Sequence, residues 1–128
     1  MILDSSAVVA LALQEPGHER LLAAIAAAAS LGIGAPTLVE TTIVLSARLG
    51  RDARGLVSRF ALEADLTVVP FTDAHFGTAL DAWLRFGRGR HPAGLNFGDC
   101  LAYATARVAG EPLLFVGDDF GKTDIEAA

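Results

Sequence analysis

The residues of this sequence that could do chemistry are acidic, and they lie where strands are expected to end. Asp4 directly follows the apolar run Met1–Leu3, and two acids follow another such run, Leu113–Val116. Because the carboxyl ends of parallel strands form the ligand-binding edge of an open sheet, acids at these positions can gather at one site. Two expected helices add one acid each. The candidate set comprises Asp4, Glu40, Asp99, Asp118 and Asp119.

Each acid also has an ordinary structural explanation. Asp4 and Asp99 could serve only as N-caps of the helices that they begin, and the Asp118-Asp119 pair is also typical of a turn. Glu40 stands alone among apolar neighbours, and a lone carboxylate needs a partner or a metal ion if it is buried. It could instead lie on the solvent face. Taken together, at the expected strand ends, the acids favour a shared site.

A site built from carboxylates alone favours Mg²⁺ or Mn²⁺ over Zn²⁺. No cysteine–histidine set competes, because Cys100 is the single cysteine and the three histidines lie far apart in the sequence. Crowded carboxylates repel one another, which raises the pKa of each carboxyl until cations fill the site. One bound ion could then activate a water and a second could stabilise the leaving oxygen. The residues therefore predict a metal-dependent hydrolase, in which Asp99 or Asp119 could orient the water.

Short apolar runs alternate with helical segments, which predicts an α/β fold with a parallel sheet and helices on both faces. Pro16 is expected early in the second helix, and Thr72 is expected to cap the fifth. The glycine-rich stretch 87–97 is expected to be irregular. The length of 128 residues suits a single domain, 1–128. Strands are expected at 1–3, 32–35, 66–69 and 113–116, and helices at 5–13, 16–30, 37–49, 52–64, 73–86 and 99–109.

The composition restricts the class of protein. Hydrophobic residues make up 52% of the chain, which is high for so small a monomer and indicates an oligomer or a tight complex. The net charge of −5 argues against a purely electrostatic nucleic-acid binder, although two divalent ions would cancel about four negative charges. No apolar run is long enough for a membrane helix, and the N-terminus does not resemble a signal peptide. The single cysteine fits a reducing cytoplasm.

Four segments carry a resemblance to a known family. They are MILDSSA at 1–7, PTLVETTIVL at 36–45, HPAGLNFGDCLAYATA at 91–106 and PLLFVGDDFGKTDI at 112–125. In this order and spacing the sequence resembles the VapC toxins of bacterial type II toxin–antitoxin systems, which belong to the PIN-domain nucleases. The resemblance extends over nearly the whole chain.

The resemblance implies a fold, an activity and partners. The fold is a three-layer α/β/α sandwich with a mostly parallel central sheet. The activity is endoribonuclease cleavage of structured RNA such as tRNA, with Mg²⁺ or Mn²⁺ as the cofactor. The partners are a VapB-like antitoxin and a second copy of the chain in a homodimer. The residues that match the family's site are Asp4, Glu40 and Asp99, a fourth acid at Asp119 or less favourably Asp118, the supporting residues Ser6 and Asn96, and Asp124 as an outer contact.

A basic segment shortly before Asp99 is expected to grip the RNA backbone. It is flexible because of its glycines, and a solvated loop is the alternative. A second group of arginines, between positions 48 and 59, is more typical of solvated helix faces. The residues expected to bind RNA are Arg85, Arg88, Arg90 and His91.

Apolar residues beyond the needs of the core could form a groove for an antitoxin helix. Such a groove could run along Leu45, Leu49, Leu56 and Phe60, although positions in the core or on a dimer surface are more typical of these residues. Trp83 and Tyr103 lie on expected helices, where a core position is more typical than base stacking.

Two other classes of protein remain open on the sequence. A receiver-type signalling domain also gathers acids around Mg²⁺, and Lys122 could supply its lysine. However, the strand at 66–69 is followed by Pro-Phe-Thr instead of a phospho-accepting aspartate. A non-catalytic interaction domain, with the acids serving only as caps, would show no dependence on divalent ions.

Overall fold

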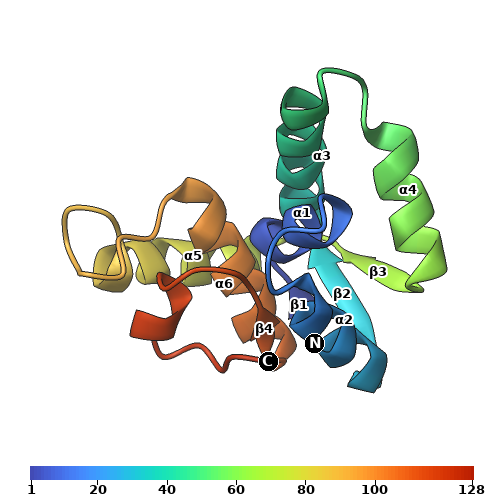
Figure 1. Cartoon of the computed structure of the whole chain (residues 1–128). Helices are drawn as coiled ribbons and strands as arrows, with labels where there is room; N and C mark the ends of the chain where they lie inside the picture. Colours follow the sequence, from blue (N-terminus) through green and yellow to red (C-terminus); the bar gives the residue numbers. More distant parts are fainter.

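The computed structural model describes all residues, 1–128, as alternating strands and helices (Figure 1). None of the helices is both long and apolar enough to span a bilayer. The strands are β1 (Ile2–Leu3), β2 (Leu31–Gly34), β3 (Leu66–Val69) and β4 (Leu113–Leu114). The helices are α1 (Ser5–Ala12), α2 (His18–Ala27), α3 (Ala35–Leu49), α4 (Arg54–Glu63), α5 (Asp73–Phe86) and α6 (Phe97–Ala109), followed by the short 3₁₀ helix η1 (Phe120–Lys122).

The four strands form one sheet in the order β3-β2-β1-β4, and every pair is parallel. Ile2 in β1 lies between Gly32 of β2 and Leu113 of β4. The amide of Asp4 donates to the carbonyl of Leu114 at 2.9 Å, which ties the end of β1 to β4. Consequently the segments after β1 and β4 leave the sheet at the same edge.

Alternation along the strands divides the core into two layers. Ile2 and Leu113 pack with α5 and α6 on one face of the sheet. Their neighbours Leu3 and Leu114 pack with α1 and α2 on the other face. Because successive side chains of a strand point to opposite faces, a strand buried on both sides needs apolar residues throughout. This arrangement confirms the expected three-layer α/β/α sandwich with a parallel sheet.

The two glycines of β2 allow close packing: Gly34 lets α6 lie against the sheet, and Gly32 makes room for the Ile2 side chain of β1. A Cβ atom on Gly34 would come 2.6 Å from the Oγ1 of Thr105 in α6, and one on Gly32 would come 2.9 Å from the Cδ1 of Ile2. The facing side of α6 is built largely from alanines, of which Ala104 and Ala106 are completely buried. The close approach fixes the start of α6, and with it Asp99, relative to β1.

Several expected boundaries are wrong. Helix α2 begins at His18, after Gly17 in a left-handed conformation, so Pro16 lies outside it. Helix α6 begins two residues before Asp99 because Asn96 caps it. Strand β4 is shorter than expected, because the chain turns away from β1 after Leu114. Trp83 is 41% exposed instead of being a core residue, whereas Tyr103 is buried as expected.

Candidate functional site

Asp4 is held at the end of β1 as the N-cap of α1. Its Oδ2 accepts hydrogen bonds from the Ser6 amide at 2.9 Å and from the Ser6 hydroxyl at 2.5 Å. Ser6 Oγ in turn accepts from the Val116 amide at 3.0 Å, beyond β4. Both bonds from Ser6 to Asp4 use Oδ2 and neither uses Oδ1. The capping function and a ligand function are therefore compatible in this side chain, and Ser6 joins the two segments that carry Asp4 and Asp119.

Asp99 is held in a similar way at the third position of α6. Its Oδ2 accepts from the Asn96 amide at 2.8 Å, and the Asn96 side chain accepts from the Asp99 amide at 2.9 Å. This reciprocal pair is a capping box, which fixes the side-chain orientation of both residues. The N-cap is therefore Asn96 and not Asp99, and Asn96 supports Asp99 directly.

Glu40 projects from α3 toward the first turn of α6. A Cβ atom on Gly98 would come 2.8 Å from both Cδ and Oε1 of Glu40, so the carboxylate occupies the space that a side chain at position 98 would fill. Sequence reasoning missed Gly98. The available signal was a glycine inside a helical turn directly before a candidate acid, where glycine is unfavourable unless close packing requires it.

The acids are electrostatically coupled. Burial raises the pKa of Asp4, which is only 4% exposed. Burial raises the pKa of Glu40, and the charges of Asp4 and Asp99 raise it further. Burial also raises the pKa of Asp99, with contributions in the same direction from Asp4 and Asp119. None of these four acids belongs to an ion pair. The site therefore concentrates negative charge that no ion pair of the chain neutralises.

Of the two acids in the turn after β4, Asp119 is the one that acts on Asp99. The charge of Asp119 contributes to the raised pKa of Asp99, whereas the charge of Asp118 does not. Both side chains are exposed. No three acidic, histidine or cysteine side chains of the chain converge closely enough to hold one ion as they stand. The acids thus lie at the same edge of the sheet and their charges interact. They would have to move closer together to bind one cation.

The four basic residues expected to bind RNA have different surroundings. Arg85 pairs with Asp124 at 2.8 Å, and Arg90 stacks over Trp83, with its Cζ 4.8 Å from the ring centroid. The ring of His91 packs edge-on against Phe86 at 5.2 Å. Arg88 has no ion pair and lies close enough to Asp99 to lower the pKa of that carboxyl.

The remaining predicted residue, Asp124, lies in a different environment. Its carboxylate accepts from the Tyr103 hydroxyl at 2.6 Å and from Arg85 at 2.8 Å, and it pairs with Arg107 at 2.7 Å. None of the other acids is among its partners. The family resemblance implies that Asp124 is an outer contact of the site; its direct partners in the structure are Tyr103, Arg85 and Arg107.

Comparisons with known proteins agree with this architecture. The model of the PIN domain family matches residues 1–126. Ribonuclease VapC36 of Mycobacterium tuberculosis is 50% identical over 127 residues, which cover 98% of this chain and 91% of that protein. Ribonuclease VapC of Mycolicibacterium smegmatis is 38% identical over 127 residues, covering 99% of this chain and 98% of that protein.

Solved structures share the fold. The crystal structure of VapC20 from Mycobacterium tuberculosis, described as a sarcin–ricin loop cleaving toxin, superposes with a TM-score of 0.79 at 21% identity, covering 99% of this chain and 97% of that one. A toxin–antitoxin complex from Klebsiella pneumoniae contains a chain with a TM-score of 0.70 at 17% identity, covering 96% of this chain and 92% of that one. The chain therefore belongs to the PIN domain family, among the VapC ribonucleases, and its acidic edge is the candidate active site of a phosphodiester hydrolase.

Proposed function

We propose that the protein is the toxin of a type II toxin–antitoxin pair and cleaves structured RNA internally with Mg²⁺ or Mn²⁺. The observation that carries this proposal is a set of acids from four separate segments that belong to no ion pair. Among them, Asp4 and Asp99 raise the pKa of Glu40, and Asp4 and Asp119 raise the pKa of Asp99. Acids that served only as helix caps or as surface residues would not need to lie so close to one another. The likeness to VapC ribonucleases supports the same activity.

The donor set fits a hard divalent cation. Asp4, Glu40, Asp99 and Asp119 offer only carboxylate oxygens, the ligands that Mg²⁺ and Mn²⁺ prefer. Such an ion would supply an activated water and stabilise charge on the phosphate oxygens. The residues of the chain itself position the acids: Ser6 orients Asp4, Asn96 orients Asp99, and Gly98 makes room for Glu40. We propose tRNA as the substrate, with other structured RNA as the alternative.

A cleavage assay tests this function. Purified protein is incubated with tRNA in Mg²⁺, in Mn²⁺ or with EDTA, beside a sarcin–ricin loop oligonucleotide as a second structured substrate. We expect discrete cleavage of tRNA with either ion and none with EDTA. The Asp99→Ala variant should lose about 10²–10⁴-fold in rate, because the site loses a cation ligand worth several kcal/mol. Cleavage that persists with EDTA or in Asp99→Ala would contradict the proposal, and cleavage of the oligonucleotide alone would exclude tRNA.

We propose that Arg88 contacts the RNA beside the acids, because it has no ion pair and its charge acts on Asp99. We expect Arg88→Ala to weaken RNA binding and to reduce the slope of affinity against salt by about one, since each phosphate contact releases about one counterion. Filter binding of tRNA over a salt series, in EDTA to prevent cleavage, measures this. Arg54→Ala, on the far helix α4, is the matched control and should leave the slope unchanged. Equal slopes for Arg88→Ala and the wild type would exclude the contact.

A groove lies where the sequence predicts an antitoxin contact. Leu45, Leu56 and Phe60 line it together with Leu22 of α2, and Arg59 and Glu63 flank it. Leu22 is 51% exposed. Apolar walls with charged rims suit the apolar face of an amphipathic helix. We propose that a VapB-like antitoxin docks here; Leu49 does not line the groove.

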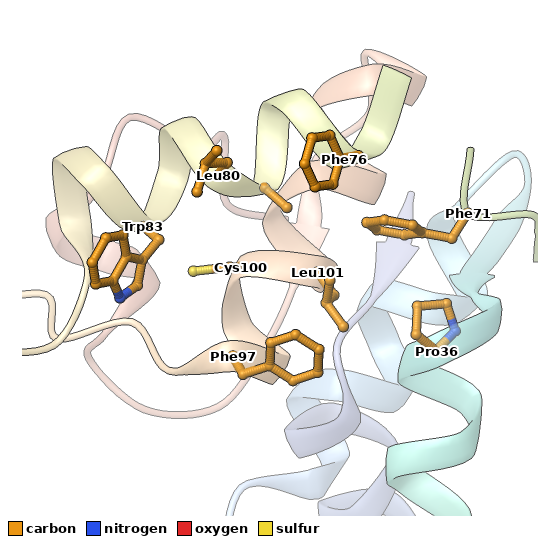
Figure 2. A pocket seen from close by; sticks show the side chains of 9 residues that line it. Pro36, Phe71, Phe76, Leu80, Trp83, Phe97, Cys100 and Leu101 are labelled. Atoms are coloured by element: carbon orange, nitrogen blue, oxygen red, sulfur yellow. The ribbon is translucent and has the colours of Figure 1, made fainter. Parts of the chain in front are cut away.

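A second apolar surface lies between α3, α5 and α6, as Figure 2 shows. It is a hollow of about 530 Å³ lined by Phe76, Leu80, Trp83 and Phe97, among others. Phe76 is 67% exposed and Phe97 is 80% exposed. An apolar patch of this kind on a small protein indicates a covered interface. We propose that a second copy of the chain covers it in a homodimer, so that antitoxin and partner copy use separate surfaces.

Two substitutions should separate these surfaces. Leu22→Lys places a charge in the groove that Leu22 forms with Leu56 and Phe60. It should release co-expressed antitoxin while the dimer persists. Phe76→Lys should produce monomers that still capture antitoxin. A buried unpaired charge costs several kcal/mol, so each loss should exceed about 10-fold in affinity. Co-purification and light scattering give the two readouts. If either variant loses both interactions while its melting temperature is unchanged, the assignment of separate surfaces is wrong.

A further inference from the structure

A group of polar side chains that the proposed chemistry does not use anchors the C-terminal segment. Tyr103 and Arg107 of α6, Arg85 of α5 and Asp124 form this group, which we call the Asp124 cluster. Arg107 donates to the Tyr103 hydroxyl at 2.8 Å and to the Asp124 carbonyl at 3.2 Å, in addition to its ion pair with the Asp124 carboxylate. The cluster therefore fixes both the backbone and the side chain of Asp124 to two helices.

The same face of α6 carries one of the candidate ligands. Asp99, Tyr103 and Arg107 follow one another at intervals of four residues, and this spacing places side chains on one helix face. Near the start of this stripe, Phe120 packs in the same buried cluster as Cys100 of α6. This packing brings the neighbouring Asp119 close enough for its charge to raise the pKa of Asp99. Further along, Tyr103 and Arg107 bind Asp124. The segment from 119 to 124 is therefore aligned along α6 at both of its ends.

Asp119 depends on this alignment because its side chain has no anchor of its own. It makes no capping hydrogen bond and no ion pair. Its direction is set by the backbone between two fixed points. One is Phe120, buried with its ring 5.1 Å from that of Phe115. The other is Asp124, linked to Phe120 through Thr123, whose hydroxyl donates to the Phe120 carbonyl at 2.7 Å.

We propose that the Asp124 cluster is a positioning device that holds Asp119 opposite Asp99 for cation binding. This inference rests on the proposed metal-dependent function. It assigns Arg85 to the positioning of Asp119 instead of to the RNA, and it assigns the buried Tyr103 hydroxyl to the same role. The cluster touches neither the cation nor the substrate.

The cluster is stable over the pH range in which the enzyme would work. Burial opposes ionisation of Asp124, but the hydrogen bonds from Tyr103 and Arg85 and the charges of both arginines outweigh it and lower the pKa of Asp124 to about 2. A comparable pair provides a control. Arg54 lowers the pKa of Asp52 to about 2 through its side-chain and backbone hydrogen bonds, in an exposed turn before α4.

The test is Mn²⁺ binding to the full chain by calorimetry, in the absence of RNA. We expect Asp124→Asn to weaken Mn²⁺ binding about 10-fold, at the lower end of the effect of residues that orient metal ligands. In the Asp119→Asn background the same substitution should have no further effect, because it acts through Asp119. Asp52→Asn should bind Mn²⁺ as the wild type does. Hydrogen exchange at the Lys122 and Thr123 amides should accelerate only in the Asp124 variant.

The outcomes separate this inference from the function on which it rests. If neither the wild type nor any variant binds Mn²⁺, the metal-dependent function fails, and the positioning role fails with it. If Asp119→Asn weakens binding but Asp124→Asn does not, or if their effects add, the positioning role alone is overturned. Should Asp124→Asn not fold, Tyr103→Phe is held to the same outcomes. It removes the 2.6 Å hydrogen bond to Asp124 and the bond that Arg107 donates to the hydroxyl, but it keeps both ion pairs of Asp124.

Discussion

Replacing Asp4 with asparagine should abolish RNA cleavage and at the same time raise the melting temperature of the metal-free protein. Asparagine is as good an N-cap as aspartate, so the hydrogen bonds from Ser6 can be kept. The negative charge, however, is lost. We expect a rate reduction of about 10²–10⁴-fold, equal to the loss of one cation ligand.

The gain in stability follows from the direction of the pKa shift. Burial raises the pKa of Asp4 in the folded chain, so between the unfolded and folded pKa values the native state binds more protons than the unfolded state. The free energy of unfolding therefore falls as pH rises through this window. At neutral pH the wild type carries this destabilisation, whereas Asp4→Asn does not. Below about pH 4, the usual pKa of aspartate, the difference should disappear.

Thermal melts of both proteins in EDTA, at neutral and acidic pH, measure this effect. Asp52→Asn is the control with opposite sign, because its lowered pKa stabilises the fold only while the carboxyl is ionised. An Asp4→Asn protein that melts below the wild type at neutral pH would show that Asp4 serves the fold first. If Asp4→Asn cleaves RNA at the wild-type rate, Asp4 does not belong to the active site.

Replacing Gly98 with alanine should reduce cleavage about 100-fold with little change in stability. The added methyl group would overlap the Glu40 carboxylate, whose Cδ lies 2.8 Å from the position of the new Cβ. Glu40 is flexible and can move away at small cost to the fold, and alanine is a better helix former than glycine. A displacement of about 1 Å in a site residue is enough for a loss of this size.

Gly77→Ala is the matched control, since it is also a helical glycine but has open space where the Cβ would be placed. It should leave cleavage unchanged. In a Glu40→Ala background, Gly98→Ala should cause no further loss, because the side chain that it displaces is absent. Wild-type rates for Gly98→Ala, or equal losses for both glycine variants, would show that the contact with Glu40 has no functional consequence.

The sequence predicted much of this protein because its strongest signals are local. Apolar runs and helical periodicity located the four strands and six helices. The alternation of strands with helices then predicted that the strands are parallel. The positions of Asp4 and Asp119 after strands then implied a common edge, since parallel strands end on the same side. The match of the PIN domain model to residues 1–126 is consistent with these signals.

Other features required the tertiary structure, because they depend on which side chains meet across elements. Gly34 of β2 permits the close approach of α6, and no local pattern reports that distance. The Asp99 carboxylate belongs both to a capping box and to the candidate site. Arg85 binds Asp124, which is 39 residues away along the chain. The amino-acid sequence by itself determined where acids leave the sheet. Only the packing of α3, α6 and the C-terminal segment decided which of them lie close enough to repel one another, because Coulomb energy depends on separation in space and on burial, not on separation along the chain.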